Sequence, residues 1–189
     1  MNMVKDNKRK RVRRIAPLAI PGLALLASFV LFFSVAGMVR HAPDPAGLSD
    51  VVYKAEITDK FFLSRSGLPS FLDTVTGLSA REPWGRWSDS KEIQFNFKSR
   101  LPHKFTLTLL AAHVTQDNIN KPFIVQAGTE SETFQVSAEQ STASVSFTNV
   151  SDAYSIKIVV PQVRSPTPGP GVDPRQLGLG IGWMQISTE

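Results

Sequence analysis

The sequence predicts an all-β domain, an antiparallel β-sandwich or jelly roll, preceded by one transmembrane helix. Apolar and polar residues alternate with a period of two in several short segments after residue 50, which is typical of strands with one buried face. No amphipathic helical pattern separates these segments, as expected for an antiparallel all-β domain. An uncharged apolar run of 25 residues, 15–39, precedes them.

The apolar run 15–39 is longer than the roughly 20 residues that cross a bilayer core. No polar face interrupts it, which argues against a buried helix of a soluble domain. A cleaved signal peptide is the alternative, because a basic segment precedes the run and Val35, Ala36 and Gly37 resemble a cleavage site. Signal peptides have apolar regions of only about 7 to 15 residues, so an uncleaved signal anchor is the favoured interpretation.

Positive charge is concentrated before the apolar run. Residues 1–14 hold seven lysines and arginines against Asp6, a local charge of +6, so the total of +5 leaves −1 for the other 175 residues. The rest of the chain therefore shows no electrostatic footprint for nucleic acid, and no nucleic-acid partner is expected. The positive-inside bias predicts a cytoplasmic tail 1–14 and places the chain after Val39 on the other side of the membrane.

Residues 40–49 contain Pro43, Pro45 and Gly47 and are expected to form a linker. The β-domain is expected at 50–189. Strands are predicted at 52–57, 71–75, 93–97, 105–109, 123–127, 133–136, 143–147, 155–160 and 177–186. The proline-rich segment 161–176 cannot be strand and is expected to form a long loop.

The last predicted strand places glycine at every second position. Leu177, Leu179, Ile181 and Trp183 would share one face, and Gly178, Gly180 and Gly182 the other. Such a glycine face indicates either a bend in the strand or the close approach of another backbone or a ligand, and we favour the bend.

No catalytic or cofactor site is expected. Cysteine is absent, which excludes disulfides and thiolate chemistry. His41, His103 and His113 have no second histidine or carboxylate at metal-ligand spacing, so no metal site is predicted and the last two are interpreted as solvated residues at strand edges. There is no nucleophile elbow and no phosphate-binding glycine loop.

The most distinctive run, 77–89, holds two of the three tryptophans. Trp84 and Trp87 flank Arg86, with Glu82 and Asp89 on either side. Exposed tryptophans stack on sugar faces while charged side chains bind hydroxyls, so these five residues form a hypothetical glycan-binding site. The alternative is structural: in a strand, Trp84 and Arg86 would share one face and Trp87 the other, making Trp87 a core residue and Arg86 an ion-pair partner of an acid.

Several segments resemble one known family: EPWGRWSD, LPHKFTLTLLA, KPFIVQAGTESETFQV, SIKIVVP and DPRQLGLGIGWMQI. They resemble the C-terminal β-domain of phosphoglycerol transferase I, a family that modifies osmoregulated periplasmic glucans; related β-domains end some bacterial membrane glycosyltransferases. The resemblance covers about residues 70–187. Arg175, in the last segment, is added to the hypothetical glycan site. The resemblance implies a Gram-negative inner membrane, with the domain in the periplasm.

The family's catalytic domain resembles alkaline phosphatases and sulfatases, with a threonine nucleophile and metal-binding acids and histidines. No segment of this sequence resembles that domain, so the resemblance implies a free-standing accessory domain and transfers no catalytic residue. We expect a non-enzymatic, membrane-anchored periplasmic module that binds periplasmic glucan or polysaccharide, or assists a phosphoglycerol or glycosyl transferase. The alternative is a structural or protein-interaction domain that docks on an inner-membrane enzyme.

The charge asymmetry around the apolar run makes the topology testable. A reporter enzyme that works only in the periplasm should be active when fused after Glu189, because the basic tail holds the N-terminus in the cytoplasm. A cytoplasm-only reporter at the same position is the control and should be inactive. The opposite pair of results would reverse the orientation.

Overall fold

The computed structural model describes residues 52–166 and 175–188. The expected tail 1–14, transmembrane anchor 15–39 and linker 40–49 lie outside the described residues, as does part of the expected proline-rich loop, 167–174. Across the two described ranges, no helix is long and apolar enough to cross a membrane.

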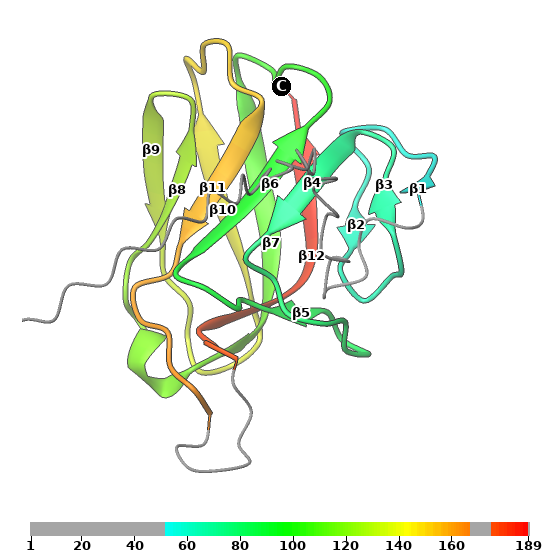
Figure 1. Cartoon of the computed structure of the whole chain (residues 1–189). Coiled ribbons are helices and arrows are strands. Elements are labelled where there is room, and N and C mark those ends of the chain that lie inside the picture. The colour runs from blue at the N-terminus through cyan, green and yellow to red at the C-terminus, as the bar shows by residue number, and fades with distance from the viewer. Residues whose placement is uncertain (1–51, 167–174, 189) are drawn as a thin grey trace, which may run out of the picture. The chain divides into compact units, whose positions relative to one another are not determined.

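The described residues form an all-β structure with a single 3-10 turn (Figure 1). The elements are, in order, β1 (Val52–Tyr53), β2 (Phe61–Phe62), β3 (Leu68–Pro69), β4 (Leu72–Thr76), β5 (Arg86–Trp87), β6 (Glu92–Phe97), β7 (Phe105–Val114), the 3-10 helix η1 (Gln116–Asn118), β8 (Phe123–Ala127), β9 (Glu130–Phe134), β10 (Ser141–Phe147), β11 (Ser155–Val159) and β12 (Leu179–Ser187).

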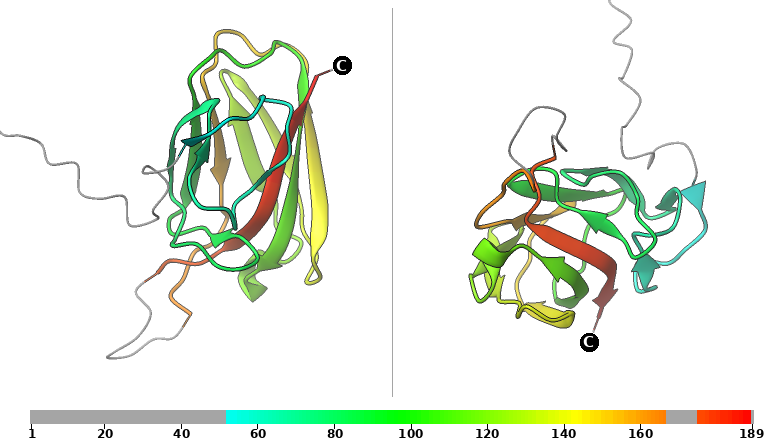
Figure 2. Two further views of the ribbon diagram at one scale, coloured as in Figure 1. Left: turned by 90° about the vertical axis from the view of Figure 1, so that its right-hand side faces the viewer. Right: turned by 90° about the horizontal axis from the view of Figure 1, so that it is seen from below.

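Two five-stranded antiparallel sheets pack face to face, as Figures 1 and 2 show from three sides. The first, called here the β12 sheet, has the order β10-β7-β12-β2, and β5 also pairs with β12. The second, the β11 sheet, has the order β4-β6-β11-β8-β9. β1 and β3 form a separate short parallel pair. The predicted all-β sandwich is therefore confirmed.

The core lies between the sheets and follows the period-two pattern of the sequence. Inward residues of β6 and β7, such as Phe95 and Leu107, are buried, while the residues between them are partly exposed. Ile156 and Ile158 of β11 and Phe123 of β8 are fully buried. Each such side chain stabilises the folded state by about 1.5–3 kcal/mol relative to an exposed one.

The observed strands match the predicted ones best where the alternation is long. β6, β8, β10 and β11 lie at the expected places, and β7 extends past its expected end to Val114. The first predicted strand ends early because the chain turns at Glu56, whose amide donates to the Asp59 carboxylate. β9 lies slightly before its predicted position, and the two-residue strands β2, β3 and β5 were not predicted, since two residues show no period.

β12 is irregular at its glycines. Its register against β7 shifts between Gly180 and Ile181 and again between Ile181 and Met184, which fits the expected bend. The shifts also correct the predicted faces. Ile181 and Met184 point into the core, whereas Trp183 is half-buried and pairs across the sheet with the exposed Phe62.

Two isoleucines on neighbouring strands provide a test of the core. Ile158→Ala, on β11, should lower the free energy of unfolding by about 2–5 kcal/mol, because it leaves a cavity at a fully buried position. Ile124→Ala, on β8, is the matched control: its side chain is 37% exposed, and the expected change is about 0.5 kcal/mol. Denaturant unfolding of both variants measures the difference, and equal losses would contradict the assigned core.

Candidate functional site

The distinctive run 77–89 folds back onto the glycine-rich part of β12. Glu82 and Gly85 close a turn through two backbone hydrogen bonds of 2.8 and 3.2 Å, and β5 follows directly. Arg86 then pairs with Ile181 and Trp87 with Gly180. Gly85 makes this possible, because a Cβ there would lie only 2.1 Å from the Ile181 carbonyl oxygen.

Arg86 points into the sandwich and is 1% exposed. Its Nε donates to the Leu63 carbonyl at 3.1 Å, and its Nη1 donates to the Ser79 carbonyl, also at 3.1 Å. A buried charge is tolerated only with such hydrogen bonds. The guanidinium therefore joins the segment after β2 and the segment before β5 to the β12 sheet.

Trp84, Trp87 and His113 form a cluster on the outer face of the β12 sheet, called here the aromatic cluster. The Trp84 ring stands edge-on to both others, with centroids 5.6 Å from Trp87 and 4.4 Å from His113. The rings of Trp87 and His113 lie nearly parallel, 5.6 Å apart. A Cβ on Gly180 would lie 2.7 Å from the Trp84 ring, so this glycine provides the space that Trp84 occupies.

Both tryptophans of the aromatic cluster are half-buried, and His113 is exposed. The cluster is thus an apolar surface with ring edges and faces partly open to solvent. Such an arrangement is suited to a ligand that has both apolar faces and hydrogen-bonding groups.

Charged groups border the aromatic cluster. The Trp84 Nε1 donates to the Glu82 carboxylate at 3.0 Å, and the Arg175 Nη1 binds the same carboxylate at 2.9 Å. Side chains of both members of this ion pair are 30% exposed. The Asp89 carboxylate accepts a hydrogen bond from the backbone N–H of Gln176, which ties the segment before β12 to the same run.

The structure thus brings Glu82, Trp84, Trp87 and Arg175 together and places Arg86 behind them in the interior. The expectation that Trp84 shares a face with Arg86 and opposes Trp87 is wrong, because Trp84 belongs to a turn and its ring folds over β12 beside Trp87.

Sequence reasoning missed His113. It is exposed, as expected, but its ring belongs to the aromatic cluster. The signal that could have found it is the glycine face of β12, because His113 pairs directly with Gly180.

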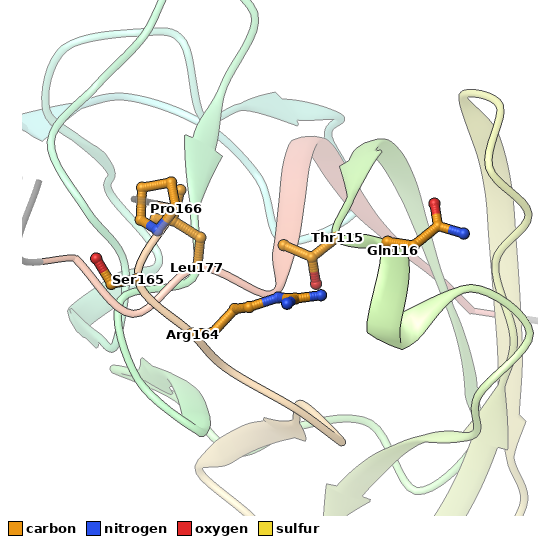
Figure 3. A pocket seen from close by; sticks show the side chains of 6 residues that line it. All are labelled: Thr115, Gln116, Arg164, Ser165, Pro166 and Leu177. Carbon is orange, nitrogen blue, oxygen red and sulfur yellow. The ribbon is translucent and has the colours of Figure 1, made fainter. Parts of the chain in front are cut away.

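A separate cavity of about 560 Å³ lies between the loops that follow β7 and β11 (Figure 3). It is lined by Thr115, Gln116, Arg164, Ser165, Pro166 and Leu177. Two of its polar side chains already have partners: the Arg164 guanidinium pairs with the Asp117 carboxylate, and the Thr115 hydroxyl donates to the Gly178 carbonyl. The cavity therefore has a weaker claim as a binding site than the aromatic cluster.

In residues 52–166 and 175–188, no three His, Asp or Glu side chains are grouped so that they could hold a metal ion.

Fold and site together define an all-β sandwich domain with an aromatic surface cluster. Residues 46–188 match the family described as "Domain of unknown function (DUF7024)". Because this match spans most of the chain, the protein belongs to that family.

Phosphoglycerol transferase I of Salmonella arizonae is 35% identical over 143 residues, which are 73% of this chain and 18% of that protein. The proteins of the same name from Salmonella paratyphi B and Salmonella newport match to the same extent. The chain therefore corresponds to less than a fifth of the length of these relatives. The predicted resemblance to the C-terminal domain of phosphoglycerol transferase I is confirmed.

Among solved structures, one named "BiXyn10A CBM1 APO" aligns with a TM-score of 0.43 and 9% identity, over 71% of this chain and 100% of that chain. This likeness is too low to support a statement about function.

Two arginines test the role assigned to the buried guanidinium. Arg86→Met should lower the free energy of unfolding by about 1–3 kcal/mol, because it leaves buried carbonyls without a donor. Arg81→Met is the matched control: Arg81 also donates to a backbone carbonyl, that of Ser64, but at an exposed position, so the expected change is within about 0.5 kcal/mol. Denaturant unfolding measures the free energy of unfolding of both variants. Similar losses of stability in both would show that the buried position of Arg86 does not determine its contribution to stability.

Proposed function

We propose that this protein is a non-enzymatic accessory module that binds glycan through the aromatic cluster. The observation that carries the proposal is the pair of half-buried tryptophans, Trp84 and Trp87, held edge-to-face on the outer surface of a sheet. Pyranose rings present C–H groups on their faces and hydroxyls at their rims. Indole faces pack against the C–H groups, and charged or amide groups nearby form hydrogen bonds with the hydroxyls.

The border of the aromatic cluster supplies such polar groups. The carboxylate of Glu82 accepts hydrogen bonds from both Trp84 and Arg175. Each side chain of this ion pair is 30% exposed, so the pair can be reached from solvent. These groups can exchange water for sugar hydroxyls at little cost.

Kinship supports the same proposal. The relatives named phosphoglycerol transferase I contain a stretch that is 35% identical to this chain, so a module of this family works as a part of a larger transferase. In this chain the module would assist a phosphoglycerol or glycosyl transferase by holding its glycan substrate near the membrane. The uncharged run 15–39 and the basic residues before it support anchoring in the inner membrane with the domain in the periplasm.

Trp84→Ala tests the proposal. If the ring stacks on sugar, its loss should weaken binding of periplasmic glucan by about 1–3 kcal/mol, as for other anchor residues. Calorimetric titration of the purified chain measures the affinity, and the melting temperature of the same samples reports any loss of packing against Gly180 and Trp87.

Tyr154→Ala is the control for this experiment, because Tyr154 is 50% exposed and precedes β11 on the other sheet. Its loss should leave glucan binding unchanged. A wild-type chain that binds no glycan, together with a large loss of stability in Trp84→Ala, would favour the alternative, a module that docks on an inner-membrane enzyme through protein contacts.

A further inference from the structure

All three tryptophans of the chain lie on the outer face of the β12 sheet. Trp87 pairs with Gly180, and Phe62 pairs with Trp183. Ile181, next to Gly180, and Met184, next to Trp183, are buried and point inward. Because neighbouring residues on a strand face opposite sides, Gly180 and Trp183 share the outer face.

The aromatic cluster and a second aromatic group, formed by Trp183 and Phe62, lie at different positions along β12. Gly180 lies beneath Trp84, and Trp183 follows three positions later, a rise of about 10 Å at roughly 3.3 Å per residue. Phe62 is 50% exposed and enlarges the second group. A distance of this size is longer than one pyranose ring, so a ligand that touches both groups must be a chain of sugars.

The β12 sheet is also almost free of charge. Its strands β7, β10, β12 and β2 contain no Asp, Glu, Lys or Arg, and the one charged residue in β5, Arg86, points inward. Strands of the β11 sheet carry Asp73, Glu92, Glu130, Glu132 and Lys157. On the outer face of the β12 sheet, charge is confined to the border, at Glu82, Arg175 and Lys60. The uncharged strands between these groups favour an uncharged ligand.

Hydroxyl groups line the part of this face formed by β7 and β10. Thr106 and Thr108 of β7 form cross-strand hydrogen bonds with Ser146 and Ser144 of β10, at 2.9 and 3.0 Å. A hydroxyl both donates and accepts, so these rows can bind the hydroxyls of a neutral sugar without desolvating a charge.

Lys60 contacts the second aromatic group. Its ammonium lies 4.0 Å from the centroid of the Trp183 ring. The ring therefore presents its electron-rich face to a positive partner. Polarised C–H groups of a sugar are attracted to an indole face in the same way, and a sugar that stacks on this face would displace the Lys60 ammonium.

We infer that the outer face of the β12 sheet binds an extended, uncharged glycan chain, with Trp84 and Trp87 holding one part and Trp183 with Phe62 holding another. This inference rests on the proposed function and adds the class of ligand and a second contact region. Trp183 and Phe62 thereby set the preference for longer chains.

Titration of the full chain in detergent micelles with a neutral linear glucan disaccharide and hexasaccharide tests the inference. The wild-type protein should bind the hexasaccharide about tenfold more tightly, the gain expected from one additional ring contact. Trp183→Ala and Phe62→Ala should each remove most of this gain and leave disaccharide affinity unchanged. Phe62→Ala is included because a half-exposed ring can be removed without opening the core. Tyr154→Ala is the control: Tyr154 is as exposed as Phe62 and precedes β11 of the other sheet, so its loss should change neither affinity.

The charge of the ligand is tested in the same titrations. Hexasaccharide affinity should not change between low and high salt, and a phosphate-bearing hexasaccharide should bind no more tightly, since exposed charges interact in a salt-dependent way. Equal affinity for both chain lengths, or tighter salt-sensitive binding of the phosphorylated chain, overturns the inference while leaving glycan binding in place. Binding of none of these sugars by the wild-type protein overturns the proposed function itself, and the inference with it.

Discussion

The contact between Gly85 and the backbone of Ile181 is the constraint on which the outer surface of the β12 sheet depends. Since a Cβ on Gly85 would lie 2.1 Å from the Ile181 carbonyl oxygen, only glycine lets the turn before β5 settle against β12. The pairing that follows sends Arg86 into the core and Trp87 outward. One close approach thus sets both the buried hydrogen bonds of Arg86 and the position of the half-buried tryptophan rings.

The parts of the fold that the sequence predicts well are those in which one physical rule acts alone. In β6 and β8 every second residue is buried, so the hydrophobic period marks both strands. β12 has the same alternation in its sequence, but register shifts on either side of Ile181 turn Trp183 outward. Such register shifts depend on contacts with other strands, so the alternation of residues within β12 does not predict them.

The candidate site was predictable in composition and not in arrangement. The sequence places Trp84, Arg86 and Trp87 in one short run, and the structure keeps the two tryptophans together. The sequence offered Arg86 as a glycan ligand or as the ion-pair partner of an acid. Its burial depends on the carbonyls of Leu63 and Ser79, which lie 23 and 7 residues away along the chain. His113 joins the cluster through the pairing of β7 with β12; the glycines of β12 indicate a close approach there, but the sequence does not say which strand supplies the approaching residue.

The strand order has a consequence for self-association. β9 ends the β11 sheet, and the free edge of a sheet is a template for strands of other molecules. Glu132 is exposed on this strand, and the carboxylate of neighbouring Glu130 accepts the Thr148 amide just after β10. A foreign strand that approached this edge would meet two acids, one of which already occupies a backbone donor of the adjoining sheet. Copies of the domain at high local concentration would therefore be protected, at this edge, from joining into continuous sheets.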